Sequence, residues 1–178
     1  PVGPLMPAAA HQRHSHAGRR SRLSPPVNRV AMSMIAAIRR KPALFGNLAC
    51  KGKRVLELGC GLGLPSLVAA HSGAEVLATD FHPDVEAYFK RNCRHSVMDV
   101  PYQRLNWRED KNDLGLFDVV MGSDILYENK HPIEVAKGLL RFLKPGGKIL
   151  LADPGRAYLQ KFIEAMNSEG HQEEMTTV

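Results

Sequence analysis

The chain has 178 residues, of which 44% are hydrophobic, and this length and composition are typical of one globular domain with a proper core. No apolar run approaches the roughly 20 residues that a helix needs to span a bilayer, which argues against a membrane protein. The three cysteines, Cys50, Cys60 and Cys93, are odd in number and lack the spacing of a metal site. They favour a reducing, intracellular compartment over a disulfide-stabilised secreted protein.

The net charge of +6 is unevenly distributed along the chain. Residues 1–56 contain eleven Lys or Arg and no Asp or Glu, whereas residues 57–178 contain 13 basic and 18 acidic residues. Because the basic charge is confined to the N-terminal part, the rest of the chain gives no indication of a nucleic-acid-binding surface.

The N-terminal part divides into a tail and a helix. Residues 1–26 are rich in Pro, Ala, His, Arg and Ser without a periodic apolar pattern, so we expect a disordered basic tail. An Arg-rich, acid-free segment is also typical of a transit peptide, so the expected location is cytoplasmic, or mitochondrial if the tail is such a signal. Residues 27–40 carry apolar residues at helical spacing and predict the first helix of a domain that covers residues 27–178.

Short apolar strands then alternate with helices over a core of residues 51–155. The expected strands are 53–58, 75–80, 102–107, 117–123 and 148–153, and the expected helices are 64–72, 83–95, 131–143 and 155–168. This alternation predicts an α/β fold, a Rossmann-like open, mostly parallel sheet with helices on both faces. A tight turn over 144–147 (Lys-Pro-Gly-Gly) is expected to lead into the fifth strand.

The first strand runs into three alternate glycines, Gly59, Gly61 and Gly63, and the second strand ends in Asp80. Such glycines let the backbone turn sharply and approach a ligand, and a carboxylate at this distance suits the ribose of a nucleoside. Glu57, just before the loop, disfavours a pyrophosphate and suits a cationic ligand. The pattern favours S-adenosylmethionine over NAD, whose fingerprint places its third glycine one position later. An NAD-dependent oxidoreductase and an ordinary strand-to-helix turn remain alternatives.

Five stretches carry a resemblance to a known family. They are VLELGCGLGLPS at 55–66, ATD at 78–80, NW at 106–107, GSDILY at 122–127 and LKPGG at 143–147. Through them the core resembles class I S-adenosylmethionine-dependent methyltransferases. More narrowly, it resembles the family 16 group, which contains many protein lysine methyltransferases.

The resemblance implies S-adenosylmethionine as the cofactor and a role for each matching residue. Gly59, Gly61 and Gly63 would form the loop under its methionine and ribose parts. Glu57 would lie near the methionine amino group or order the loop, and Asp80 would bind the ribose hydroxyls.

The adenine would lie between residues that follow the second and third strands. Phe81 would pack on the ring or else in the core. The amide of Asn106 would reach the adenine amino group, and Trp107 would stack on the ring or else pack at the sheet edge.

The remaining implied roles follow the fourth strand. Ser123 would contact the cofactor, and Asp124 and Tyr127 would be catalytic by orienting a lysine amine and accepting its hydrogen bonds. An alternative for Asp124 is a helix cap or a loop carboxylate. Arg156 is expected to pair with Asp153 or another acidic group.

The eight histidines show no metal-ligand spacing, so no metal site is predicted. Four of them fall at the ends of the expected helices and are expected on the surface: His71, His82, His95 and His131.

Two features depart from the family pattern. The region 24–40 contains Pro25-Pro26 and no Trp, where the family usually carries a Trp-Pro segment near the active site. Residues 171–178 leave room for at most one short strand of the reversed hairpin that closes the fold. We therefore expect part of this hairpin to be missing and the fifth strand to present an exposed edge, which self-association would cover.

The sequence thus predicts S-adenosylmethionine-dependent methyl transfer, with a lysine side chain of a protein as the acceptor. A protein substrate is the expected partner, without nucleic acid or membrane. A small-molecule N- or O-methyltransferase and a non-catalytic cofactor-binding protein remain alternatives.

Overall fold

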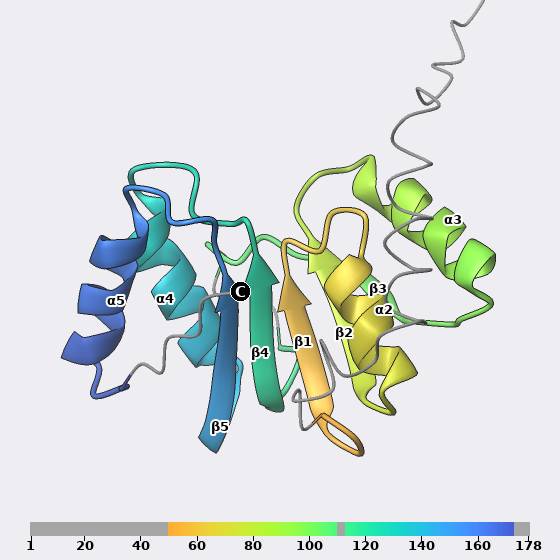
Figure 1. Ribbon diagram of the computed structural model, residues 1–178, viewed down its shortest axis with the longest axis horizontal. Coiled ribbons are helices and arrows are strands. Elements are labelled where there is room, and N and C mark those ends of the chain that lie inside the picture. Colours follow the sequence, from red (N-terminus) through yellow and green to blue (C-terminus); the bar gives the residue numbers. More distant parts are fainter. Residues whose placement is uncertain (1–49, 110–112, 173–178) are drawn as a thin grey trace, which may run out of the picture.

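The structure, a computed structural model, describes residues 50–109 and 113–172, which form a five-stranded parallel sheet with helices beside it (Figure 1). The strands are β1 (Arg54–Leu58), β2 (Glu75–Asp80), β3 (Tyr102–Arg104), β4 (Phe117–Ser123) and β5 (Leu143–Ala152). The helices are α2 (Leu64–His71), α3 (Val85–Ser96), α4 (His131–Arg141) and α5 (Leu159–Ser168). The predicted tail and the predicted helix 27–40 lie outside the described residues, as does most of the predicted segment 171–178.

The strand order β3-β2-β1-β4-β5 confirms the predicted open α/β sheet. From β1 the chain moves outward through β2 to β3, and it then returns to place β4 on the other side of β1. The order reverses between β1 and β4, and in open α/β sheets ligands bind at the carboxyl ends of the strands beside such a point. In Figure 1 these ends point upward.

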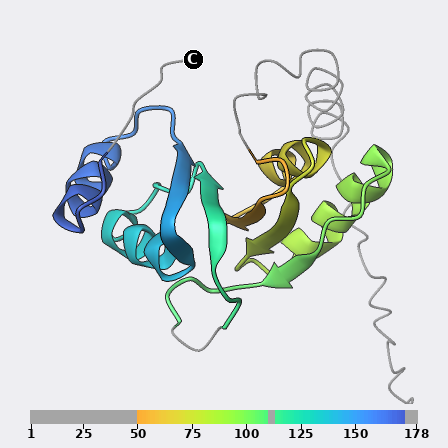
Figure 2. The same cartoon turned by 90° about the horizontal axis from the view of Figure 1, so that it is seen from below.

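Helices lie on both sides of the sheet (Figure 2), and alternate residues of the central strands pack against one side or the other. Val55 and Val119 belong to an apolar cluster with residues of α2 and α3, whereas Leu56 and Val120 belong to a second cluster with residues of α4 and α5. Both faces of β1 and β4 are therefore buried, which explains why their sequences are almost continuously apolar.

The third strand is shorter than predicted, because the pairing with β2 ends early. Leu105 still donates its N–H to the carbonyl of Asp80 at 2.9 Å, but Asn106 then begins a turn closed by the N–H of Glu109 at 3.0 Å. The turn carries Trp107 away from the strand and into the cluster beneath α4.

The fifth strand begins earlier than predicted, and the expected turn lies inside it. Phe117 pairs with Leu143 and Val119 pairs with Lys148, so the pairing with β4 shifts register between these two positions. Gly146, with a φ of +73°, lies in the shifted segment. The Lys-Pro-Gly-Gly sequence therefore forms an irregularity within β5 rather than a turn before it.

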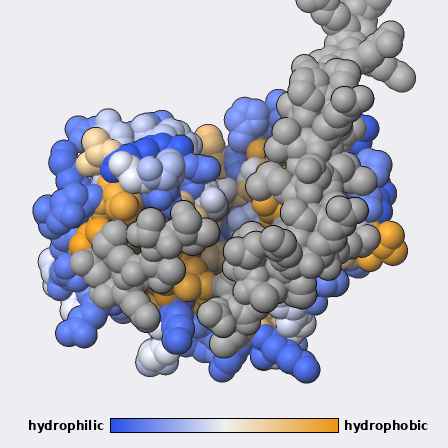
Figure 3. Space-filling view, viewed as in Figure 1, coloured by the Kyte–Doolittle hydropathy of each residue, from blue (hydrophilic) through white to orange (hydrophobic). Residues whose placement is uncertain are grey.

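The described surface is hydrophilic over much of the side seen in Figure 3, and apolar residues show in several separate places on it. None of the helices within the described ranges is long and apolar enough to cross a membrane. The three cysteines are buried free thiols, and burial raises the pKa of each.

Candidate functional site

The loop between β1 and α2 is shaped by its three glycines, all of which have a positive φ (+67°, +49° and +82°). A Cβ on Gly59 would lie 2.7 Å from the side chain of Ile125, and one on Gly63 would lie 2.3 Å from the ring of Phe89. A Cβ on Gly61 would meet nothing within 4 Å. The outer two glycines thus allow close packing, whereas Gly61 presents bare backbone to open space that a ligand can fill.

Glu57 stabilises this loop through hydrogen bonds to the first turn of α2. Its side chain is 1% exposed, and its Oε2 accepts hydrogen bonds from the backbone N–H (2.9 Å) and the hydroxyl of Ser66 in the first turn of α2. Its Oε1 is buried without a hydrogen-bond partner. Burial raises the pKa of Glu57 to about 8, and the nearby carboxylate of Asp80 adds to this shift. Of its two implied roles, ordering the loop is the one that the contacts support.

Asp80, at the carboxyl end of β2, faces the same loop. Its Oδ2 accepts the N–H of Gly61 and its Oδ1 accepts the N–H of His82, both at 2.9 Å. Because a carboxylate has about four acceptor sites, both oxygens keep capacity for a further donor such as a ribose hydroxyl.

The residues implied for adenine differ in how they lie. Phe81 is exposed beside the loop, with the guanidinium of Arg104 5.8 Å from its ring centroid, so the core alternative for Phe81 is wrong. Asn106 is half-buried, and its amide accepts the N–H of Arg108 and donates to Glu109, which stabilises its own turn. Trp107 is buried against Gly59, and its Nε1 has no hydrogen-bond partner.

The end of β4 presents Ser123, which is half-buried, and Asp124, whose side chain is 65% exposed. Asp124 adopts a φ of +60°, and its N–H donates to the carbonyl of Ala152 at the end of β5. Its Oδ1 lies 2.7 Å from Nη2 of Arg156. Asp124 is therefore an exposed carboxylate held at the carboxyl edge of the sheet, and it caps no helix with its side chain.

Arg156 pairs with Asp153, the partner named from the sequence, and also with Asp124. Its Nη1 lies 3.0 Å from Oδ2 of Asp153, in addition to the contact with Asp124. The second acidic group, which the sequence did not identify, is therefore Asp124.

Tyr127 is 58% exposed, and its ring meets that of His131 edge to face at 4.4 Å between centroids. His131 was predicted at the surface, but it is only 2% exposed. Its Nδ1 lies 2.8 Å from the carbonyl of Ile125, and its Nε2 lies 3.3 Å from Glu128. The prediction was wrong because the edge of Trp107 and the ring of Tyr127 enclose this histidine at the start of α4.

The fold brings together the glycine loop, Asp80, Phe81 and the segment 123–127 at the carboxyl edge of the sheet. It does not place Trp107 on the open side of the loop. Two residues that support the site were not identified from the sequence, since neither belongs to a spacing pattern. They are Ser66, which binds Glu57, and His131, which packs against Tyr127. Among the described residues, no cluster of His, Cys, Asp and Glu is suited to hold a metal ion.

Comparison with known families decides between the remaining readings. The family described as "Lysine methyltransferase" matches residues 29–169. The chain belongs to this family.

Three curated relatives illustrate its range. Histone-arginine methyltransferase METTL23 of Xenopus laevis is 39% identical over 84 residues, which are 44% of this chain and 36% of the relative. Protein N-lysine methyltransferase METTL21A of Danio rerio is 38% identical over 90 residues, 47% of this chain and 41% of the relative. A ubiquinone biosynthesis O-methyltransferase of Xanthomonas oryzae is 36% identical over 107 residues, 59% of this chain and 44% of the relative. The chain thus spans less than half the length of these relatives.

The fold agrees with this family. A ribosomal protein L11 methylase from Lactobacillus delbrueckii superposes with a TM-score of 0.64 at 19% sequence identity, covering 87% of this chain and 74% of the other.

S-adenosylmethionine is the methyl donor of this class of methyltransferase, and the loop fits it. The open space above Gly61 gives room for a ligand that lies against the backbone. The loop carries no cation for a pyrophosphate, and the carboxylate of Asp80 lies beside it. This environment favours a cationic nucleoside over NAD.

Proposed function

We propose that the chain transfers a methyl group from S-adenosylmethionine to the side-chain amine of a protein lysine. The observation that carries this proposal is the exposed carboxylate of Asp124, held at the carboxyl end of β4 beside the glycine loop. A carboxylate at this place can bind the amine of a substrate. METTL21A, a relative of this chain, is named a protein lysine methyltransferase.

In this proposal the cofactor lies over the glycine loop. The backbone at Gly59, Gly61 and Gly63 supports its methionine and ribose parts, and Asp80 accepts the ribose hydroxyls. Glu57 keeps the loop in place, while Ser123 contacts the cofactor from the end of β4.

Phe81 and Asn106 are the candidates for the adenine. The ring of Phe81 stands exposed beside Asp80 and offers an aromatic face. The amide of Asn106 would have to leave its turn to reach the base, and Trp107 supports the loop from the buried side rather than stacking on the base.

Bound S-adenosylmethionine supplies an electrophilic methyl group, whose bond to sulfur breaks as the new carbon–nitrogen bond forms and the sulfur keeps the electron pair as a thioether. The residues of the chain must align the acceptor nitrogen and help it to lose one proton. Asp124 and Tyr127 are the two exposed polar side chains placed for that work.

The experiment is methyl labelling of a whole cell extract with labelled S-adenosylmethionine, followed by mass spectrometry of the proteins. We expect labelled lysine in one or a few proteins, and none with the Asp124→Asn variant. Calorimetric titration with S-adenosylhomocysteine checks the cofactor separately, and an absence of binding at millimolar ligand would reject the whole assignment.

A second candidate is a small-molecule O- or N-methyltransferase, which the similarity to a ubiquinone biosynthesis O-methyltransferase favours. The same labelling experiment separates the two, since label in the organic extract rather than in protein identifies the second. Binding of S-adenosylhomocysteine without any transfer would indicate a non-catalytic cofactor-binding protein.

We further propose that the protein acts inside the cell, which three buried free thiols support.

We also propose that two copies of the chain associate through the edge of β5. Within the described ranges β5 pairs with β4 alone, so its other edge is open to such pairing.

A further inference from the structure

Arg156 links the ends of β4 and β5, beside the place where the proposed lysine acceptor would bind. One guanidinium nitrogen lies 2.7 Å from Asp124, which follows β4, and the other lies 3.0 Å from Asp153, which follows β5. A backbone hydrogen bond of 2.9 Å from Asp124 to Ala152 links the same two strand ends. The three charged side chains therefore form one connected unit at this edge of the sheet.

The two carboxylates of this unit differ sharply in exposure. The side chain of Asp153 is 1% exposed, and its Oδ1 also accepts the N–H groups of Gly155 and Arg156 at 2.9 and 2.7 Å. The side chain of Asp124 is 65% exposed. Arg156 thus contacts the buried carboxylate as well as the exposed one, so we expect it to stay in place when a ligand approaches Asp124.

Asp124 keeps room for a second donor. Arg156 contacts its Oδ1, and a carboxylate offers about four acceptor sites in all. An amine bound to the rest of this carboxylate would lie within a few ångströms of a fixed positive charge.

The positive charge of Arg156 affects how easily a lysine amine can lose its proton and be methylated. The amine reacts through its lone pair, but the free side chain has a pKa of about 10.4 and is protonated at neutral pH. A lone carboxylate raises the pKa of a bound amine further, whereas a cation nearby lowers it. The contact with Asp124 itself raises the pKa of Arg156, so the guanidinium remains charged.

We propose that Arg156 is a positioning residue that fixes the orientation of Asp124 and offsets its charge, so that the acceptor amine binds there and still loses its proton to the solvent that reaches this exposed carboxylate. The proposal rests on the proposed function and extends it. It follows that Asp124 without Arg156 would hold the acceptor as an unreactive ammonium ion.

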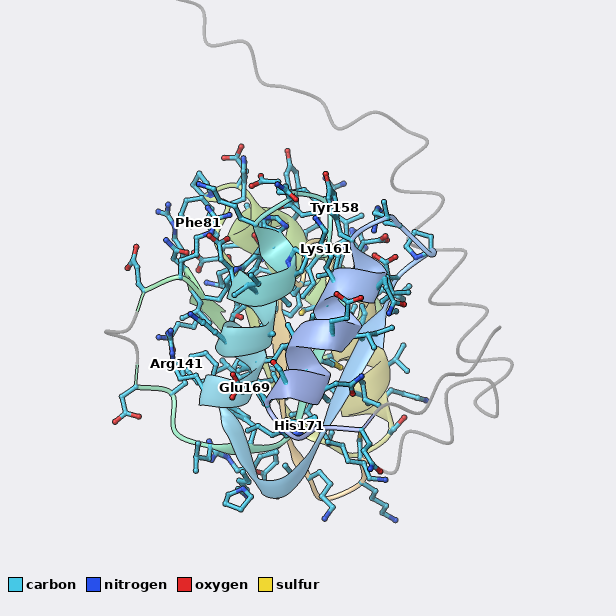
Figure 4. The ribbon with its side chains drawn as sticks, turned by 90° about the vertical axis from the view of Figure 1, so that its left-hand side faces the viewer. Phe81, Arg141, Tyr158, Lys161, Glu169 and His171 are labelled. Atoms are coloured by element: carbon cyan, nitrogen blue, oxygen red, sulfur yellow. The ribbon has the colours of Figure 1, made fainter. Side chains whose placement is uncertain are left out.

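Other titratable side chains lie at this end of the molecule. They are Asp80 of β2, Tyr127 and Glu128 of the loop after β4, His131 of α4, Tyr158 just before α5, and Lys161 of α5. Figure 4 shows Tyr158 and Lys161 at the same end of the molecule as Phe81, with Glu169 and His171 at the other end. Lys161 contacts Asn129 at 3.3 Å, and it is the matched control for a general effect of positive charge.

The test is the pH dependence of lysine methylation by the wild type, Arg156→Gln, Arg156→Lys and Lys161→Met. The probe is heat-treated cell extract with methyl-labelled S-adenosylmethionine, and methyl-lysine is quantified after acid hydrolysis. Glutamine and lysine both lose the planar fork of arginine, but only lysine keeps the charge. Arg156→Met replaces Arg156→Gln if the latter does not fold, as judged by thermal melting.

We expect Arg156→Gln to move the rising, acidic limb of the profile upward by about one pH unit, with little change for Arg156→Lys or Lys161→Met. Affinity for S-adenosylhomocysteine should not change in any variant. An equal shift in both Arg156 variants, or a lower rate without a shift, would overturn the proposal. A wild type that labels no lysine would instead reject the proposed function, and this inference with it.

Discussion

The buried carboxyl group of Glu57 makes the stability of the fold depend on pH. Burial raises the pKa of Glu57 from 4.5 to about 8, so the folded chain holds the carboxyl proton of Glu57 more tightly than the unfolded chain does. The stability that the proton supplies is complete below about pH 4.5 and is lost as the pH rises through about 8.

We predict that the free energy of unfolding falls between pH 5 and 8 with a slope of up to about 1.4 kcal/mol per pH unit from this group. Glu57→Gln should remove that slope, since the amide does not titrate. Urea unfolding at several pH values measures it, and Glu75→Gln at the exposed start of β2 is the control. A slope in Glu57→Gln equal to that of the wild type would refute the assignment.

Asp80 supports both the loop and, in our proposal, the ribose. We predict that Asp80→Ala weakens S-adenosylhomocysteine binding by about 1–3 kcal/mol, because charge-assisted hydrogen bonds are lost. Asp80→Asn should lose less, since one oxygen still accepts a backbone N–H. Calorimetry gives both values, and Asp84→Ala, at the exposed start of α3, should leave affinity unchanged. Equal affinity for Asp80→Ala and wild type would remove Asp80 from the site.

At the scale of elements, the glycines of the loop between β1 and α2 have different roles: Gly63 packs in the core, and Gly61 faces open space where a ligand can bind. We predict that Gly63→Ala destabilises the protein by about 2–4 kcal/mol, because the methyl group would meet the ring of Phe89 in a left-handed backbone conformation. Gly61→Ala should cost about 1 kcal/mol of stability, from the backbone alone, and weaken cofactor binding instead. Thermal melting and calorimetry on both variants provide the comparison. The prediction fails if Gly61→Ala is the less stable of the two.

The order and type of the elements could be predicted because short, mostly apolar strands alternate along the chain with helices. The glycine loop and Asp80 could be placed because the carboxyl ends of neighbouring parallel strands meet at one edge. The end of β3 and the irregularity in β5 could not be predicted, since they depend on hydrogen bonds between strands. The burial of His131 depends on Trp107 and Tyr127, which only the folded chain brings to it.

At the scale of the whole molecule, the basic N-terminal segment is expected to be separate from folding. We predict that deleting residues 1–26 leaves the melting temperature and the affinity for S-adenosylhomocysteine unchanged within error, because the segment has no apolar pattern to bury. A clear loss of stability would show that it contacts the domain. A fusion of the segment to a fluorescent protein tests targeting, and a diffuse cytosolic signal would reject a mitochondrial role.

The position of β1 in the middle of the sheet governs how the chain folds. Val55 pairs with Val76 on one side, 21 positions away, and with Val119 on the other, 64 positions away. The nearer closure costs less chain entropy, so we expect β1, β2 and the helix between them to assemble first and β4 to dock on a surface that already exists. Until β4 docks, the apolar edge of β1 would stand open. We therefore expect the slowest and most aggregation-prone stage of folding to be the pairing of β4 with β1, which also completes the ligand-binding edge of the sheet.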